Sequence, residues 1–410
     1  MKHLKLLAIA FLCVTPLFVW ADGDEENKDW KLIAQIRQRS EVDNRDFNSD
    51  TGLESFTGLR SRLGVLFTPA EDLSAFFQVQ DTRFFGTETS TLFDGRADNF
   101  DLRQAYFHLK DLFSWPVDIK MGRMEVNYGP QRLIGAVGWH PIGRSFDGGI
   151  LTIKGDGKSL DIFSFKEVEE FEIEDKGDRS VGGAYGNINV GDSHKVQPFI
   201  IWQISTPDSI INRFTTGFYV NGKPGNFRHE LEFAYQGGSV GDLDVAAYMF
   251  AANFGYVFSD VSTKPMVSIG VDYLSGDDTL GDNDIKFFDT LYGTNHKYYG
   301  FMDYFLNIPV NTFGRGLMDL HLRSSININK STKLALALHN FSSTEDFVGT
   351  GGETETAFGK EIDLTLTHKY NSQLGITIGA SIFSPGEIFK QERGEDLSSW
   401  YYLMTTVNLK

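Results

Sequence analysis

Residues 373–382 read QLGITIGASI, and the apolar side chains of this stretch occupy every second position. The polar side chains Gln373, Thr377 and Ser381 fall between them. Because successive side chains of a β-strand point to opposite faces, this alternation predicts a strand with one apolar and one polar face. The preceding stretch 362–369, IDLTLTHK, alternates in the same way.

The same period of two recurs along the chain, bounded by clusters of Gly, Asp, Asn, Ser and Pro. It is clear in LIAQIRQR at 32–39, LRSRLGVLF at 59–67, LSAFFQVQDT at 73–82 and LALAL at 334–338. Helical periodicity is hard to find, and after residue 21 no apolar run approaches the 18 residues typical of a membrane-spanning helix. The pattern therefore predicts an all-β protein.

Two all-β architectures fit this alternation: a large soluble sandwich or propeller, and a closed barrel with lipid outside and a polar lumen. The polar faces carry Arg, Lys and Gln in mid-strand, and aromatic residues gather at predicted strand ends, namely 84–85, 298–299 and 400–402. Such aromatics form the interfacial girdles of membrane barrels. The chain also closes with an alternating strand at 401–409, although it ends on Lys410 rather than on an aromatic residue. We therefore predict a closed antiparallel transmembrane β-barrel of about 18 strands with a polar lumen.

The first 21 residues have the composition of a signal peptide. A positive start with Lys2 and Lys5 precedes an apolar core, and Val19 and Ala21 supply small residues before a predicted cleavage site. The single cysteine, Cys13, lies inside this segment, so residues 22–410, the predicted barrel domain, contain no cysteine and no disulfide or thiolate site. The net charge of −17 excludes nucleic acid as a partner.

Five motifs in order carry a more specific signal. They are LRQAY at 102–106, MGRME at 121–125, YGPQRL at 128–133, WHPIGRSFDG at 139–148 and FDTLYGTNHKYYG at 288–300. Together they resemble the alginate export family of outer-membrane barrels. The resemblance implies an 18-stranded barrel in the bacterial outer membrane that acts as a passive channel for anionic polysaccharide or related solutes. It singles out Arg123, Arg132 and Arg144.

Arginines are concentrated in the first third of the mature chain, and several fall on the polar faces of predicted strands. A guanidinium matches a carboxylate bidentately, and rings of Arg or Lys favour anions in pores. We therefore predict a lumen biased toward anions, with Glu125 and Asp147 as ion-pair partners of the motif arginines. The alternative is that the arginines only brace the wall against lumen carboxylates. The predicted pore-lining residues are Arg37, Arg39, Arg60, Arg62, Arg103, Arg123, Glu125, Arg132, Arg144 and Asp147.

Other chemistry has weaker support. The histidines at 108, 140, 296, 321 and 339 lack metal-ligand spacing, so no metal site and no cofactor are predicted. An acidic cluster at 277–284 does not follow the EF-hand spacing and is expected to be a solvated loop rather than a calcium site. Ser324 or Ser325 beside His321 is the one arrangement from which a hydrolase could be argued.

The sequence thus predicts a non-enzymatic outer-membrane channel for anionic polysaccharide or sugar acids. Its partners would be membrane lipid, lipopolysaccharide, the solute itself and periplasmic export proteins. Three alternatives stay open: a general or small-anion porin, an outer-membrane barrel hydrolase and a soluble β-rich binding protein. Whether residues 128–143 fold into the lumen or connect strands at the rim also stays open.

Overall fold

The computed structural model describes residues 29–86, 100–169, 178–205, 211–349 and 351–409. The predicted signal peptide, residues 1–21, lies outside the described residues. The strands are β1 (Trp30–Asn44), β2 (Glu54–Ala70), β3 (Leu73–Phe84), β4 (Asp101–Leu109), β5 (Val117–Met124), β6 (Phe146–Gly155), β7 (Lys158–Val168), β8 (Arg179–Val190), β9 (His194–Ser205), β10 (Ile211–Gly222), β11 (Phe227–Val240), β12 (Leu243–Val257), β13 (Met266–Leu274), β14 (Asp284–Ile285), β15 (Leu317–Asn327), β16 (Thr332–Val348), β17 (Thr354–Lys369), β18 (Leu374–Pro385) and β19 (Ser398–Leu409).

Helical structure within the described ranges is confined to short pieces. These are η2 (Ser49–Thr51), η3 (Leu112–Ser114), η4 (Asn295–Lys297), η5 (Val310–Thr312) and α2 (Glu387–Glu392). None of these described helices is long and apolar enough to cross a membrane.

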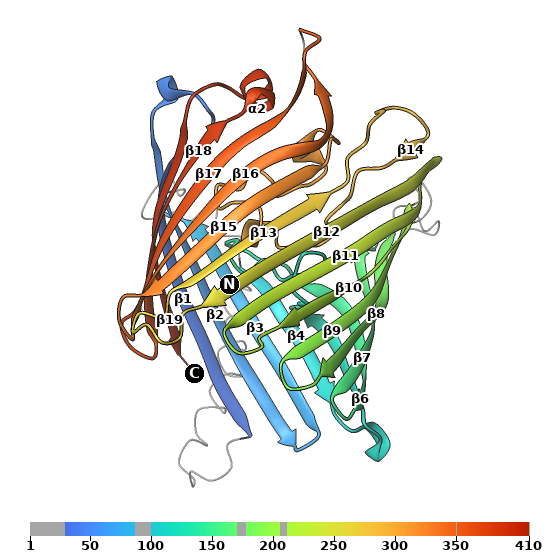
Figure 1. Cartoon of the computed structure of the whole chain (residues 1–410). Helices are drawn as coiled ribbons and strands as arrows, with labels where there is room; N and C mark the ends of the chain where they lie inside the picture. Colours follow the sequence, from blue (N-terminus) through green and yellow to red (C-terminus); the bar gives the residue numbers. More distant parts are fainter. Residues whose placement is uncertain (1–28, 87–99, 170–177, 206–210, 350, 410) are drawn as a thin grey trace, which may run out of the picture.

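The strands form one closed antiparallel barrel (Figure 1). Each long strand pairs with its neighbours in sequence, and β1 closes the ring by pairing with β19 from Ala34–Leu409 to Asn44–Ser399. The two-residue β14 pairs in parallel with β12 and is not one of the strands that close the ring. In the ring, β13 pairs directly with β15. Apart from β14, the described residues contribute 18 strands to the wall, which confirms the predicted fold class and strand number.

Alternating burial identifies the two faces of the wall. On β1, Ile36 is 52 % exposed, whereas the next residue, Arg37, is only 7 % exposed. On β2, Leu63 is likewise exposed, whereas Arg60 is buried. The apolar rows thus face outward and the polar rows face the lumen, as a barrel in lipid requires.

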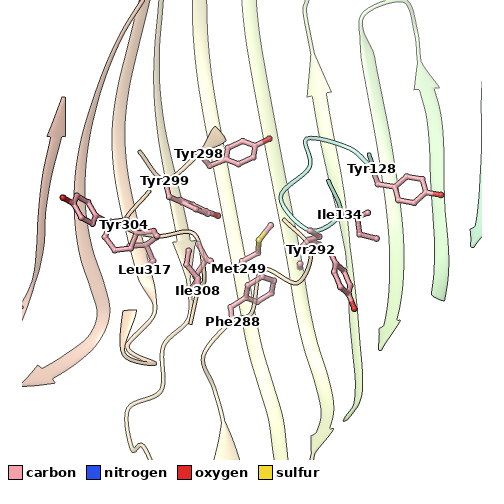
Figure 2. Close-up of a cluster of buried hydrophobic side chains, with 14 of the residues drawn as sticks. Tyr128, Ile134, Met249, Phe288, Tyr292, Tyr298, Tyr299, Tyr304, Ile308 and Leu317 are labelled. Atoms are coloured by element: carbon pink, nitrogen blue, oxygen red, sulfur yellow. The ribbon is translucent and has the colours of Figure 1, made fainter. Parts of the chain in front are cut away.

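The two ends of the barrel differ in the length of their connections. At the end that holds the first residue of β1 and the last of β19, the turns are short, as at 71–72, 156–157 and 370–373. The opposite end carries long connections, including 125–145 between β5 and β6 and 275–316 between β13 and β15. We call these two the first and second inner segments, because both fold into the barrel (Figure 2).

The hydrophobic core therefore lies inside the barrel, between the inner segments and the wall. Figure 2 shows Tyr128 and Ile134 of the first inner segment and Phe288 and Tyr299 of the second within it. The prediction that 298–299 and 400–402 form interfacial girdles is wrong for most of these residues. Tyr298, Tyr299, Trp400 and Tyr402 are buried inside, while Tyr401 is exposed. Strand alternation sends neighbouring aromatic side chains of β19 to opposite faces.

Candidate functional site: the channel lumen

The first inner segment leaves the β-wall because its sequence cannot continue a strand. Residues 125–145 contain Gly129, Pro130 and Pro141 and show no alternation. Gly129 adopts a φ of +51°, and a Cβ at this position would lie 2.2 Å from the Tyr185 hydroxyl oxygen. The backbone can therefore turn tightly against β8 only at a glycine. Of the two positions left open by the sequence, the segment occupies the lumen.

The two inner segments hold each other by backbone pairing. The Tyr292 amide donates to the Leu133 carbonyl at 2.9 Å, and the Gly135 amide donates to the Tyr292 carbonyl at 3.0 Å. Arg144 reinforces this junction, since its guanidinium donates to the carbonyls of Gly135 and Tyr292. Arg144 thus joins the two segments to each other.

Five arginines on β1, β2 and β4 form an arginine wall on the lumen face beside the first inner segment. They are Arg37, Arg39, Arg60, Arg62 and Arg103. Arg37 donates to the carbonyls of Gly138, Trp139 and His140 at 2.8, 2.9 and 3.2 Å, and Arg60 donates to the Gly138 and His140 carbonyls. The wall therefore holds residues 138–142 by their backbone oxygens.

Only part of the arginine wall is neutralised by carboxylates. Arg39 pairs with Glu41 at 2.6 Å, and Glu125 accepts from both Arg62 and Arg103 at 3.2 and 2.7 Å. Arg37 and Arg60 form no ion pair with a described residue, and their partners are carbonyl oxygens and the Gln35 amide. The five guanidiniums thus face two carboxylates.

His140 lies where the arginine wall meets the first inner segment. Its Nδ1 accepts the Ile142 amide at 3.2 Å. Partial burial, and then repulsion from Arg39, lowers the pKa of His140 below its ordinary value of 6.5. His140 is therefore held in its neutral form at pH 7.

The remaining predicted site residues are Arg132, which lies inside the barrel, and Arg123 and Asp147, which lie on β5 and β6. Arg132 is enclosed rather than open to the lumen, because its Nη1 lies 2.7 Å from Asp272, its Nε lies 3.2 Å from Glu232, and its guanidinium stacks 3.7 Å from the Tyr298 ring centre. Arg123 and Asp147 pair at 2.6 Å.

The pore-lining prediction needs correction for Arg123 and Asp147. In the strand register they stand opposite each other, on the sheet face away from the buried side chains of Met124 and Phe146. They share the outward row of Met121, which is 47 % exposed. The motif places charge at this row, but alternation points that charge away from the lumen. Glu125 pairs with Arg62 and Arg103 rather than with Arg123, Arg132 or Arg144.

A cavity of about 910 Å³ lies between the inner segments and the wall toward the short-turn end. Six cationic side chains line it, against two carboxylates, Glu230 and Asp363. None of the six forms an ion pair with a described residue. They are Lys195, Lys223, Arg228, Lys297, Arg323 and Lys333.

Sequence reasoning missed these six cations because they come from separate strands and from η4. Four of them lie near strand ends, where a solvated charge is the ordinary expectation, namely Lys195, Lys223, Arg228 and Lys333. Strand parity could have placed Arg323 on the inward face, two residues after His321, but only closure of the barrel brings the six around one space.

Two further candidates from the sequence were the Ser324/Ser325–His321 arrangement and the acidic cluster at 277–284. Within the described residues, no hydrogen bond joins Ser324 or Ser325 to His321, so the hydrolase arrangement is not assembled. In the acidic cluster, Asp277 caps backbone amides, and Asp278 pairs with Lys286 at 2.6 Å.

Comparison with known proteins agrees with this geometry. Residues 30–402 match the alginate export family. The chain belongs to the alginate export family. Comparison with curated protein sequences gives no match.

Solved outer-membrane channel structures share the fold of this alginate export family member. OccD3 (OpdP) of Pseudomonas aeruginosa matches with a TM-score of 0.62 and 12 % identity, covering 93 % of this chain and 91 % of its own. OccAB4 of Acinetobacter baumannii matches with a TM-score of 0.62 and 11 % identity, covering 94 % of this chain and all of its own. The outer membrane protein OpdK of P. aeruginosa matches with a TM-score of 0.59 and 12 % identity, covering 92 % and 99 %.

The protein is therefore an outer-membrane β-barrel channel of the bacterial cell surface, as predicted. In such barrels the short turns face the periplasm and the long connections face outward. The six-cation cavity accordingly lies on the periplasmic side of the inner segments.

Proposed function

We propose that this channel passes anionic saccharides, either polysaccharide or sugar acids, by passive diffusion through a lumen biased by cationic side chains. The observation that carries the proposal is the six-cation cavity, where six Lys and Arg side chains that form no ion pair within the described residues face two carboxylates. The arginine wall adds two guanidiniums, Arg37 and Arg60, whose partners are neutral. Cations that line a lumen with low-dielectric walls raise the local concentration of anions.

Hydrogen-bonding chemistry favours a saccharide acid over a bare anion. Tyr219, Gln197, Asn221 and Asn253 line the same cavity beside the cations. Amide and phenol groups can pair with sugar hydroxyls while Lys and Arg bind the carboxylate. A general or small-anion porin is the alternative, and it would use the charges without the amides.

The proposal includes no catalytic step. Lipid and lipopolysaccharide would surround the outer rows, and polymer export would need periplasmic partners at the short-turn end. Flow would follow the concentration gradient of the solute.

Planar-bilayer recording tests this function. In a KCl gradient, the purified protein should show a reversal potential of anion-selective sign, and oligouronates on the periplasmic side should block the current. The variant Lys195→Gln, Lys223→Gln, Lys333→Gln lowers the cavity from six cations against two carboxylates to three against two. At about 0.2–1 kcal/mol for each exposed pair, three lost cations should weaken block about 3- to 140-fold.

A matched control keeps the same change of net charge outside the cavity. The variant Lys110→Gln, Lys158→Gln, Lys264→Gln alters three exposed lysines that do not line the cavity. It should leave block and selectivity unchanged. Equal effects of the two triple variants would show that net charge, rather than the cavity, sets selectivity. Selective conductance of small anions with no oligouronate block would support the general porin instead.

A further inference from the structure

Two histidines face each other on adjacent strands of the lumen wall. The register of β15 and β16 places His321 directly opposite His339. Asp319 precedes His321 by two residues and so shares its inward face. The three side chains are almost completely enclosed, with exposed fractions of 0–2 %. We call Asp319, His321 and His339 the histidine cluster.

The polar atoms of the histidine cluster converge. Asp319 Oδ2 lies 2.8 Å from Nδ1 of His339 and 3.3 Å from Nδ1 of His321. One polar atom from each residue lies within 4.8 Å of both others. Ligand atoms of a tetrahedral ion with metal–ligand distances of about 2.0–2.2 Å lie about 3.3–3.6 Å apart. The 3.3 Å separation matches this spacing, and the 2.8 Å hydrogen bond would lengthen when an ion binds.

Hydrogen bonds within the described residues leave the histidine cluster incomplete. Neither ring nitrogen of His321 makes a hydrogen bond of acceptable geometry, although Nδ1 is near Asp319, and Oδ1 of Asp319 also has no partner. Buried polar atoms of this kind are costly unless something else binds them. The unsatisfied atoms are the two imidazole nitrogens of His321 and one carboxylate oxygen of Asp319, and both atom types serve as metal ligands.

The wall makes room for the His321 ring at one position. Gly270 on β13 stands opposite His321, and a Cβ there would lie 2.3 Å from His321 Nε2. Glycine is therefore needed for His321 to keep this inward position.

Charge around the histidine cluster calls for a cation. Five buried carboxylates lie on β11, β13, β15 and β17, whereas Arg132 is the guanidinium that neutralises two of them. The five are Glu232, Asp272, Asp319, Glu361 and Asp363. Buried carboxylates usually persist when they are paired or coordinate a metal. A divalent ion at Asp319 would supply the missing positive charge.

A second carboxylate stands behind one of the histidines. Nε2 of His339 lies 3.9 Å from Oδ2 of Asp363, whose Oδ1 accepts the Ser381 hydroxyl at 2.5 Å. Metal-bound histidines commonly direct their other ring nitrogen to a carboxylate. His339 and Asp363 also line the six-cation cavity, so the histidine cluster borders the lumen.

We propose that Asp319, His321 and His339 bind a divalent first-row transition-metal ion such as Zn²⁺, with Asp363 orienting His339. Two imidazoles and a carboxylate suit Zn²⁺ and its neighbours, whereas Ca²⁺ and Mg²⁺ prefer ligand sets made of oxygen. Sequence spacing cannot reveal this site, because His321 and His339 are joined by strand pairing rather than by a motif.

Cobalt titration of tag-free, chelator-treated barrel in detergent tests the proposal, because tetrahedral Co²⁺ absorbs visibly. The wild type should bind one equivalent, and Zn²⁺ should displace it. Asp363→Asn should weaken binding about 10- to 100-fold, and His321→Asn or His339→Asn should weaken it further. The control His229→Asn changes a histidine that pairs with His194 outside the cluster, at 5.2 Å between ring centres, and should bind normally.

Two results would overturn the proposal. One is a folded wild-type barrel that binds no stoichiometric Co²⁺ or Zn²⁺. The histidine cluster would then be a hydrogen-bonded group of side chains that binds no metal. The other is binding that persists in the double variant His321→Asn, His339→Asn. If these variants do not fold, X-ray absorption of the Zn²⁺-loaded wild type decides, since the proposal requires two imidazoles in the first coordination shell.

Discussion

Replacing Arg132 by methionine should destabilise the barrel more than any comparable change at its surface. The Arg132 side chain is 5 % exposed, and those of its carboxylate partners Asp272 and Glu232 are 1 % and 3 % exposed. Removing one partner of a buried pair costs about 3–5 kcal/mol, because the remaining charges lose their compensation. The ratio of folded to unfolded barrel should therefore fall roughly 100- to 4,000-fold at equal urea concentration.

Urea unfolding of the barrel in lipid vesicles, followed by tryptophan fluorescence, measures this loss. Two matched variants separate buried charge from general damage. Arg132→Met combined with Asp272→Asn and Glu232→Gln should recover most of the stability, since no charge is then left unpaired. Arg179→Met removes a pair with Glu167 at 3.6 Å, with 45 % of the Arg179 side chain exposed, and should cost less than about 1 kcal/mol. A loss below about 1 kcal/mol for Arg132→Met, or no recovery in the triple variant, would refute the reasoning.

Three further changes test the inner segments and the motif glycine. The double variant Arg37→Gln, Arg60→Gln removes charged donors that hold residues 138–142. Maleimide labelling of a cysteine placed in this segment should therefore accelerate about 10-fold or more. An unchanged labelling rate would show that other contacts hold the segment. Because the pKa of His140 is lowered, the folded segment binds fewer protons than the opened one, so a fall in pH from 7 to 5 favours opening. Labelling should therefore speed up relative to a cysteine in an exposed turn labelled at the same pH, which cancels the loss of thiolate, and His140→Gln should abolish this effect. Residue 122 has a φ of +127°, and Gly122→Ala would place a Cβ 2.2 Å from a neighbouring carbonyl oxygen. This substitution should lower the free energy of unfolding in urea by about 1–3 kcal/mol. Wild-type stability of the variant would contradict this.

Side chains of opposite charge contact the two sides of the first inner segment. The arginine wall lies on β1, β2 and β4, whereas the buried carboxylates Glu232, Asp272 and Asp319 lie on β11, β13 and β15. Arg132 extends from the first inner segment to this acidic side. The first inner segment is thus held on one side through its carbonyls and on the other through an arginine.

The fold could be predicted from sequence because its signal is local. Alternation with a period of two shows which face of a strand is apolar, and it placed Arg37 and Arg60 on inward rows without any knowledge of their neighbours. Arg103 is buried beside a register shift between β3 and β4, which alternation does not reveal. The five ordered motifs between residues 102 and 300 indicated the family. They singled out Arg123 and Asp147 as pore-lining residues, whereas strand parity on β5 and β6 turns both side chains outward.

Only the tertiary structure decided which residues the inward-facing side chains of the strands contact inside the barrel. The burial of Tyr298, the enclosure of Arg132 and the meeting of His321 with His339 depend on strand register and on where the inner segments lie. A strand pattern reports the face on which a side chain lies, whereas a contact across the lumen depends on every strand between the two residues. Closure of the ring between β1 and β19 is what brings such distant residues around one space.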